Sequence, residues 1–387
     1  MTATPMKVQH TLWAGREWND ELPADCPFER SRALTSLRFT GRAAAYTEAD
    51  TWYLSWASDG RCYTPWTDGM VDNFMATSKG PMAVTGAAVI EGDHPLALEV
   101  VPLGVWRAPV GPYGGRYPCG SLVHDGVWYY GTYCLDETDR GLNWDVMGPF
   151  VGFSVSHDLG RRWEEPPWTP AGPIFGEPGK QGRKVKMGAP HFVDFGCNMR
   201  WSPDGLAYLL GHGGSSVSAE VSWISGDEIY LARVRPAPGT INSPENYEFF
   251  AGHGPDGPAR WAARVGDSQP LISWPGHCGC VTATFVPPLG RYLMCVTDGW
   301  PTIKEMTSYV LESESLTGPW SIVSYLRDFG PQAYFLNLPS RFISHDGLTM
   351  WLSYSANFTN AAYGTHFQPD PPGSRYSMCL QELTLLR

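Results

Sequence analysis

The sequence predicts an all-β fold, and two observations carry that prediction. Residues 127–133, 206–210, 281–286 and 350–355 are short segments rich in aromatic and β-branched side chains, each bounded by Gly, Pro, Asn or Asp. That pattern is typical of β-strands. The 34 Pro residues are spread along the chain at intervals that leave little room for long helices.

A recurring turn divides the chain into units of about 70 residues, the length that a four-stranded blade with long connections needs. Each turn has Asp-Gly or Gly-Arg followed by a strand-like segment. The turns begin at Asp59, Asp125, Asp204, Gly290 and Asp346. Asp-Gly between apolar runs favours a type I′ hairpin, because both central residues of that turn need positive φ. We therefore expect a five-bladed β-propeller in a single domain; an irregular β-sandwich or two β-domains is the alternative.

A second motif also favours blades. Residues 156–163 follow the pattern Ser-x-Asp-x-Gly-x-x-Trp, which resembles the Asp-box of sialidases and related propellers. In such a turn the Asp accepts hydrogen bonds from backbone amides while the Trp packs on the hairpin. Asp158 is therefore expected to be structural. The propeller is expected over residues 46–387, with residues 1–45 packing on it or closing it.

The composition limits the class of partner. Only 17% of the residues are charged, and 28 Lys+Arg against 39 Asp+Glu give a formal net charge of −11. This balance argues against nucleic acid, because phosphate binding requires clustered basic side chains. No run approaches the roughly 18 apolar residues of a membrane span, so no membrane partner is expected. The 17 Trp residues favour a flat, neutral ligand.

The beginning of the chain and its cysteines bear on the compartment. Residues 1–10 show no charged region followed by an apolar one, so no signal peptide is visible. Nine Cys residues are scattered without a Cys-x-x-Cys pair, which indicates buried reduced thiols. A cytoplasmic location is predicted, or a secreted one if a leader has been removed.

One segment combines carboxylates and tryptophans. Asp50 and Asp68 lie at the two open ends of a predicted hairpin whose turn holds Asp59, and Trp52 and Trp66 lie beside them. Because facing residues of a hairpin lie ~5 Å apart, the two carboxylates can share one rim. Glycoside hydrolysis uses two carboxylates ~5 to 9.5 Å apart, and their proximity separates their pKa values. We expect Asp50 and Asp68 to be catalytic; Asp59 is expected to be a solvated turn residue.

This hairpin resembles the first blade of a formerly uncharacterised propeller family that includes endo-D-arabinanases. Four later segments also resemble that family: residues 223–234, 247–252, 290–294 and 316–320. The resemblance implies a glycoside hydrolase acting on an oligo- or polysaccharide, with furanosides such as arabinosides or arabinan favoured. It makes Asp50 and Asp68 the acid/base or nucleophile pair. The family's glycine before the second Asp is Thr67 in this chain.

Further site residues are expected around this pair. Arabinanase- and xylosidase-like propellers place a Glu acid near the third blade, a position that Glu220 shares; a surface Glu at a blade edge is the alternative. The expected substrate-binding residues are Trp52, Trp56, Trp66, His191, His212, Asp298 and Trp300. Stacking on tryptophan suits sugar C–H faces. A structural role is the alternative for His191, and a turn cap for Asp298.

Other chemistries find less support in the sequence. No His-x-x-x-His pair or His/carboxylate cluster indicates zinc, and no cofactor is expected, although a structural Ca²⁺ on the propeller axis is left open. Gly-x-Ser-x-Gly and phosphate-loop motifs are absent. One alternative is a carbohydrate-binding propeller without catalysis. Another is a polysaccharide lyase that uses His191 or His212 with a Tyr, which would want a basic cleft.

Overall fold

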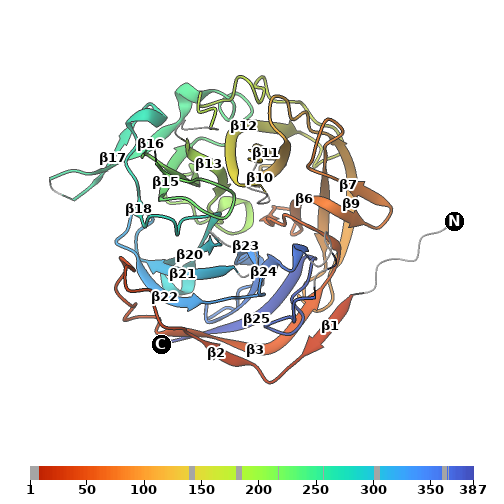
Figure 1. Ribbon diagram of the computed structural model, residues 1–387, viewed down its shortest axis with the longest axis vertical. Helices are drawn as coiled ribbons and strands as arrows, with labels where there is room; N and C mark the ends of the chain where they lie inside the picture. Colours follow the sequence, from red (N-terminus) through yellow and green to blue (C-terminus); the bar gives the residue numbers. More distant parts are fainter. Residues whose placement is uncertain are drawn as a thin grey trace.

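Five sheets are arranged as blades around a central axis in the computed structural model (Figure 1). It describes residues 8–138, 144–179, 185–216, 218–255, 257–299, 306–359, 364 and 366–387. The all-β class and the five blades are confirmed. These residues also form short 3₁₀ helices: η1 (Cys197–Met199), η2 (Pro244–Asn246), η3 (Val265–Asp267), η4 (Pro287–Leu289) and η5 (Ser340–Phe342). No helix in the described ranges combines the length and apolarity needed to cross a membrane.

The first three blades follow one another along the chain. Blade one contains β4 (Glu48–Asp50), β5 (Ser55–Trp56), β6 (Cys62–Val71), β7 (Phe74–Ala76), β8 (Val84–Glu91) and β9 (Glu99–Arg107). Blade two contains β10 (Gly115–His124), β11 (Val127–Asp136) and β12 (Val146–Ser156). Blade three contains β13 (Val185–Phe192), β14 (Ala207–Gly214), β15 (Glu228–Val234), β16 (Glu248–His253), β17 (Ala259–Ala262) and β18 (Ile272–Ser273).

The last two blades complete the ring. Blade four contains β19 (Val281–Val286), β20 (Arg291–Asp298), β21 (Thr307–Ser313) and β22 (Ser321–Leu326). Blade five contains β23 (Tyr334–Asn337), β24 (Thr349–Ser355), β25 (Cys379–Leu386), β3 (Ser36–Ala45), β1 (Gln9–Leu12) and β2 (Arg16–Trp18).

The two ends of the chain share blade five. β3 pairs with β25 in antiparallel register, with Ala44 opposite Leu380 and Leu37 opposite Leu385, and the two strands lie side by side in Figure 1. The segment before β3 crosses blade four, where the Ser31 amide donates to the Ile322 carbonyl at 2.8 Å. N-terminal strands thus close the ring by completing the sheet of its last blade.

The recurring turns occupy equivalent places in the five blades. Each joins the innermost strand of a blade to its second strand, and the glycine of each turn has positive φ. These glycines are Gly60, Gly126, Gly205, Gly290 and Gly347. Only Asp125-Gly126 has positive φ at both residues, so the predicted type I′ conformation is wrong for the turns at Asp59, Asp204 and Asp346, where the glycine alone has positive φ. The position of each turn nevertheless marks the same corner of every blade.

The Asp-box-like segment forms the turn after β12. Asp158 accepts a hydrogen bond from a backbone amide of the same turn at 2.8 Å. Trp163 packs against Trp128 of blade two and Trp106 of blade one, with ring centroids 5.1 and 4.7 Å apart. The tryptophan therefore contributes to packing between two blades.

Candidate active site

A cavity of about 690 Å³ opens at the end of the propeller where the innermost strands begin. Asp50 at the end of β4, Tyr117 near the start of β10 and Tyr334 at the start of β23 all line it. Asp68 lines it as well, from β6. Both expected catalytic carboxylates are therefore brought to one cavity.

A β-bulge turns Asp68 towards that cavity. In the β4–β6 register Glu48 lies opposite Met70 but Asp50 lies opposite Thr67, so β6 carries one extra residue there. Asp68 has φ 44° and the next residue, Gly69, has φ 147°. A Cβ on Gly69 would lie 1.9 Å from the Glu48 carbonyl oxygen, so the bulge requires glycine at this position.

Asp50 is the more deeply buried carboxylate, with 6% of its surface exposed. It accepts hydrogen bonds from Thr51 Oγ1 at 2.8 Å and from the Tyr334 hydroxyl at 2.9 Å. Burial and the neighbouring charge of Asp68 raise the pKa of Asp50 well above its ordinary value, although these two donors oppose the rise. Asp50 therefore keeps its proton to higher pH than an ordinary aspartate does.

Asp68 is partly exposed, and its hydrogen-bond donors favour the ionised carboxylate more than those of Asp50 do. Both the backbone amide and the Oγ of Ser78 donate to its carboxylate, each at 2.6 Å. Burial raises the pKa of Asp68, while Ser78 and the nearby Lys79 act in the opposite direction. Backbone and hydroxyl donors favour the ionised form of a carboxylate, so the two acids have different environments.

Aromatic side chains form two walls of the cavity. On one wall Trp144 packs edge-on against Tyr117, with ring centroids 5.8 Å apart. On the other wall Trp223 packs edge-on against Tyr334 at 5.1 Å and against Phe358 at 5.8 Å. Sequence reasoning missed all five residues. The available signal was positional for Tyr334, which begins an innermost strand, and for Tyr117, which lies near the start of another. Trp223 begins one of the segments that resemble the propeller family, and no motif marked Trp144 or Phe358.

The expected stacking role of Trp52 and Trp66 is corrected by the structure. Their side chains are 1% and 0% exposed, and the two rings stack on each other with centroids 6.4 Å apart. Strict alternation would direct Trp66 and Asp68 to the same face of β6, but the bulge between them changes the face. Trp56 follows at the far end of the innermost strand and lies near Arg200, so it does not line the cavity.

Three other expected residues also lie outside the cavity lining. Glu220 is exposed in the connection between β14 and β15. His191 is buried with Nε2 3.3 Å from Cys280 Sγ, and His212 is buried with Nε2 2.7 Å from the Ser222 carbonyl oxygen. Burial lowers the pKa of His191 to about 3 and that of His212 to about 4. Their expected contact with sugar is thereby corrected to a place in the core.

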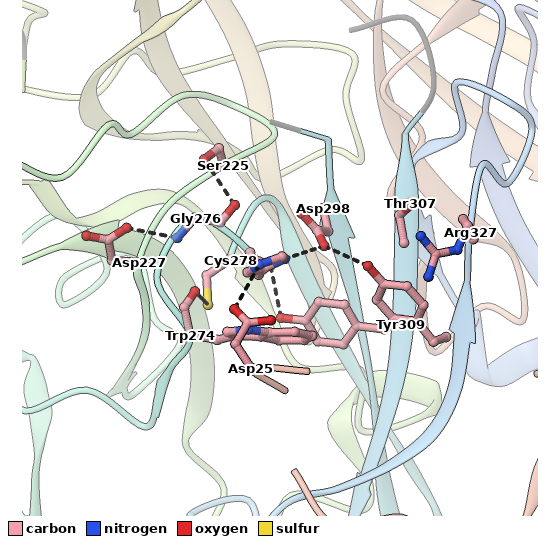
Figure 2. A network of polar contacts seen from close by, with 12 residues as sticks. Asp25, Ser225, Asp227, Trp274, Gly276, Cys278, Asp298, Thr307, Tyr309 and Arg327 are labelled. Atoms are coloured by element: carbon pink, nitrogen blue, oxygen red, sulfur yellow. Dashed lines mark hydrogen bonds and ion pairs between the residues drawn. The ribbon is translucent and has the colours of Figure 1, made fainter. Parts of the chain in front are cut away.

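Asp298 belongs to a separate polar network, shown in Figure 2. It is 6% exposed and accepts a hydrogen bond from His277 Nδ1 at 2.7 Å. The other ring nitrogen of His277 lies 3.5 Å from Asp25, which also accepts a hydrogen bond from Trp274 Nε1 at 3.2 Å. Asp298 therefore helps to hold the N-terminal segment. Trp300, the last expected binding residue, lies outside the described residues.

The described ranges contain no group of three or more His, Cys, Asp or Glu side chains that could hold a metal ion. The Tyr53 ring of blade one and the His191 ring of blade three lie 3.9 Å apart. A structural Ca²⁺ on the propeller axis stays open, as it was from the sequence.

Comparisons with known proteins find similarity in structure only. No family model matches the chain, and no curated protein matches it. A candidate hydrolase from Bacteroides ovatus superposes with a TM-score of 0.53 at 12% identity, covering 95% of this chain and 96% of its own. This likeness shows the fold.

More distant structures include two complexes with oligosaccharides. An α-L-arabinofuranosidase from Podospora anserina, in complex with cellotriose, has 10% identity, a TM-score of 0.45 and coverage of 97% and 98%. The GH43_1 enzyme from Xanthomonas citri, complexed with xylotriose, has 16% identity, a TM-score of 0.45 and coverage of 89% of each chain. At this distance the chemistry of the present chain rests on its own residues.

Proposed function

We propose that this protein is a glycoside hydrolase in which Asp50 and Asp68 cleave a glycosidic bond inside the cavity. The observation that carries the proposal is the meeting of two carboxylates with unequal environments on one aromatic-walled cavity. Glycosidases need such a pair, one carboxyl group protonated and the other ionised. The expectation drawn from the hairpin sequence supports the same pair.

The environments assign the roles. Asp50 is deeper and its pKa is raised by burial and by Asp68, so it acts as the general acid that protonates the leaving oxygen while the C–O bond breaks. Asp68 accepts two hydrogen bonds from Ser78, so it carries the negative charge. It then either attacks the anomeric carbon or takes a proton from the attacking water.

The walls supply the binding surface. Trp144 and Trp223 take the place that the sequence had suggested for Trp52 and Trp66, because indole faces pack well on sugar C–H groups. Tyr117, Tyr334 and Tyr376 also line the cavity. Burial raises the pKa of each phenol well above its ordinary value, so all three remain hydrogen-bond donors. The substrate is an oligo- or polysaccharide, with arabinosides or arabinan favoured by the resemblance of the first blade.

The two alternative functions have less support. A lyase needs a base beside the sugar, but His191 and His212 are buried outside the cavity lining and the cavity phenols are protonated. A non-catalytic carbohydrate-binding propeller would not require two carboxylates with separated environments at one place. An unsaturated product would support the lyase, and binding without turnover would support the binding protein.

The test is a screen of aryl furanosides and arabinans with mass detection of the released sugar. Asp50→Asn and Asp68→Asn should each reduce turnover by at least about a thousandfold, as expected when one of a catalytic pair is lost, while thermal unfolding remains cooperative. Glu220→Gln is the matched control, because Glu220 is exposed and does not line the cavity. Retained activity in either Asp variant would remove that residue from the mechanism.

A further inference from the structure

Exposed apolar side chains concentrate on the β6–β7 hairpin and on the connection that follows it to β8. Six large hydrophobic side chains are exposed within the described part of the chain. Four of them fall within 13 consecutive positions, 70–82, and the other two are Leu12 and Trp201. We call the four the apolar arm: Met70, Phe74, Met75 and Met82, which are 43%, 39%, 66% and 67% exposed. Met70 and Met75 are directly opposed and share one face of the β6–β7 hairpin, whereas Phe74, opposite Val71, projects to the other face. Neighbouring exposed apolar side chains of this kind mark a binding surface more often than single ones do, since single exposed apolar residues are normal.

The apolar arm is continuous with the cavity. Glu48 of β4 lies opposite Met70 of β6, and Met70 lies opposite Met75 of β7. Directly opposed residues project to the same face of a sheet, so these three side chains form a line. Glu48 itself lines the cavity, as do Gly69 of β6 and residues 77–79, which follow β7. The line therefore leads from the cavity edge to the surface.

The assignment of Asp50 as the general acid indicates which part of the substrate would lie along Glu48, Met70 and Met75. Asp50 lies two residues after Glu48 on β4, so in an extended strand their side chains share a face. The acid must lie beside the oxygen that leaves with the aglycone, the group that is not retained as the sugar product. The aglycone would then extend from Asp50 past Glu48 and onto Met70 and Met75.

We propose that the apolar arm binds an apolar aglycone, so that the substrates include glycosides of alkyl or aromatic alcohols. This deepens the proposed function and depends on it. Methionine side chains are flexible and polarisable and adapt to apolar groups of irregular shape, whereas sugar subsites are built from rigid aromatic faces and polar groups. β6 also carries Asp68, and the Ser78 that donates to it follows β7, which ties the arm to the proposed catalytic carboxylate.

The test compares matched glycosides that differ only in the length of the aglycone. Methyl and n-hexyl glycosides of α-L-arabinofuranose, α-D-arabinofuranose and β-D-xylopyranose form the panel, because alkyl leaving groups of similar acidity isolate binding from leaving-group chemistry. The ratio of hexyl to methyl kcat/KM should be above one in the wild type. The double variant Met70→Gln/Met75→Gln should lower that ratio about tenfold, because the hexyl group would lose most of its apolar contact with the protein. Trp201→Gln, which removes an exposed apolar side chain on a different connection, should leave the ratio unchanged.

A binding measurement separates this proposal from the proposed function. Calorimetry with the Asp50→Asn variant should show tighter binding of hexyl than of methyl glycosides, and the preference should vanish when the two Met substitutions are added. Preferential binding with no turnover by the wild type would support the arm and contradict the hydrolase. An equal hexyl-to-methyl ratio of kcat/KM in the wild type and in Met70→Gln/Met75→Gln would overturn the proposal that the arm binds the aglycone. Absence of binding of every glycoside in the panel would overturn it as well. Dissociation of a dimer by the Met substitutions with an unchanged ratio would assign the patch to a second copy and also overturn it.

Discussion

The hydroxyl of Tyr334 donates a 2.9 Å hydrogen bond to the carboxylate of Asp50 across 284 positions of sequence. Tyr334 begins the innermost strand of blade five and Asp50 ends the first strand of blade one. The contact therefore spans the seam that the N-terminal strands close, and it exists only in the completed ring. It also connects one wall of the cavity with the proposed acid.

Loss of this hydrogen bond should alter the pH dependence of activity. Burial and Asp68 raise the pKa of Asp50 and Tyr334 opposes them, so Tyr334→Phe should raise this pKa further. Activity needs protonated Asp50 and falls as pH rises through its pKa. The alkaline limb of the kcat/KM profile should therefore move to higher pH by about one unit. Tyr325→Phe, in the separate Asp298 network, is the control; an unmoved limb in Tyr334→Phe would contradict the assignment of the acid.

The hydrogen bond from Ser78 to Asp68 should set the position of the acid limb of the kcat/KM profile. The Oγ of Ser78 donates to Asp68 at 2.6 Å, which favours the charged form, so Ser78→Ala should raise the pKa of Asp68. Activity needs ionised Asp68 and falls as pH drops through that pKa. The acid limb should therefore move up by about one unit, while the backbone amide of residue 78 still donates. Ser344→Ala breaks a comparable Ser–Asp contact in a remote turn and should leave the profile unchanged; a shift there of equal size would make the effect nonspecific.

The bulge predicts a sharp difference between two glycines of blade one. Gly69 has φ 147° and no room for a Cβ, whereas Gly104 has φ 131° and nothing within 4 Å of that position. Gly104→Ala should cost only the conformational penalty of about 1 kcal/mol. Gly69→Ala adds a backbone clash and should cost several kcal/mol in total, about 3 or more. Denaturant unfolding measures the loss of unfolding free energy in each variant. Equal losses would show that the backbone relieves the clash at Gly69 without a cost in stability.

Activity should separate the same two glycine variants. Gly69→Ala displaces the bulge that directs Asp68 to the cavity, so turnover of the remaining folded protein should fall at least about a hundredfold, as expected when a catalytic group is misplaced. Gly104→Ala should retain activity, because Gly104 does not line the cavity. A folded Gly69→Ala variant with normal turnover would separate the bulge from function.

The His277 network should make stability depend on pH. Burial lowers the pKa of His277, but Asp298 and Asp25 outweigh it, so the folded pKa lies above the ordinary 6.5. A group with a raised folded pKa stabilises fully below its unfolded pKa, and that contribution is lost as pH rises through the folded pKa. The Tm difference between wild type and His277→Gln should therefore be larger at about pH 6 than at about pH 9. His345→Gln in an exposed turn is the control; a difference that grows with pH would contradict the ion pairs.

The fold could be predicted from the sequence because it depends on local features such as turns and hairpins. Turn residues such as Asp125 and Gly126 act over a few positions, and each recurring pair marked the same corner of a blade. Hairpin geometry likewise predicted that Asp50 and Asp68 would meet, because the two ends of a hairpin are close whatever surrounds them. These features need no knowledge of contacts between distant segments.

The lining of the cavity depends on two features of the structure that cannot be read from the sequence. One is the extra residue at Gly69, since a shift of one position exchanges the faces of a strand and left Trp66 in the core while Asp68 reached the cavity. The other is ring closure, which brings Tyr334 to Asp50. The sequence by itself determined the blades and the carboxylate pair, because turns and hairpins are local. Only the tertiary structure decided which aromatic rings face the cavity, because that follows from register and from contacts between blades far apart in the chain.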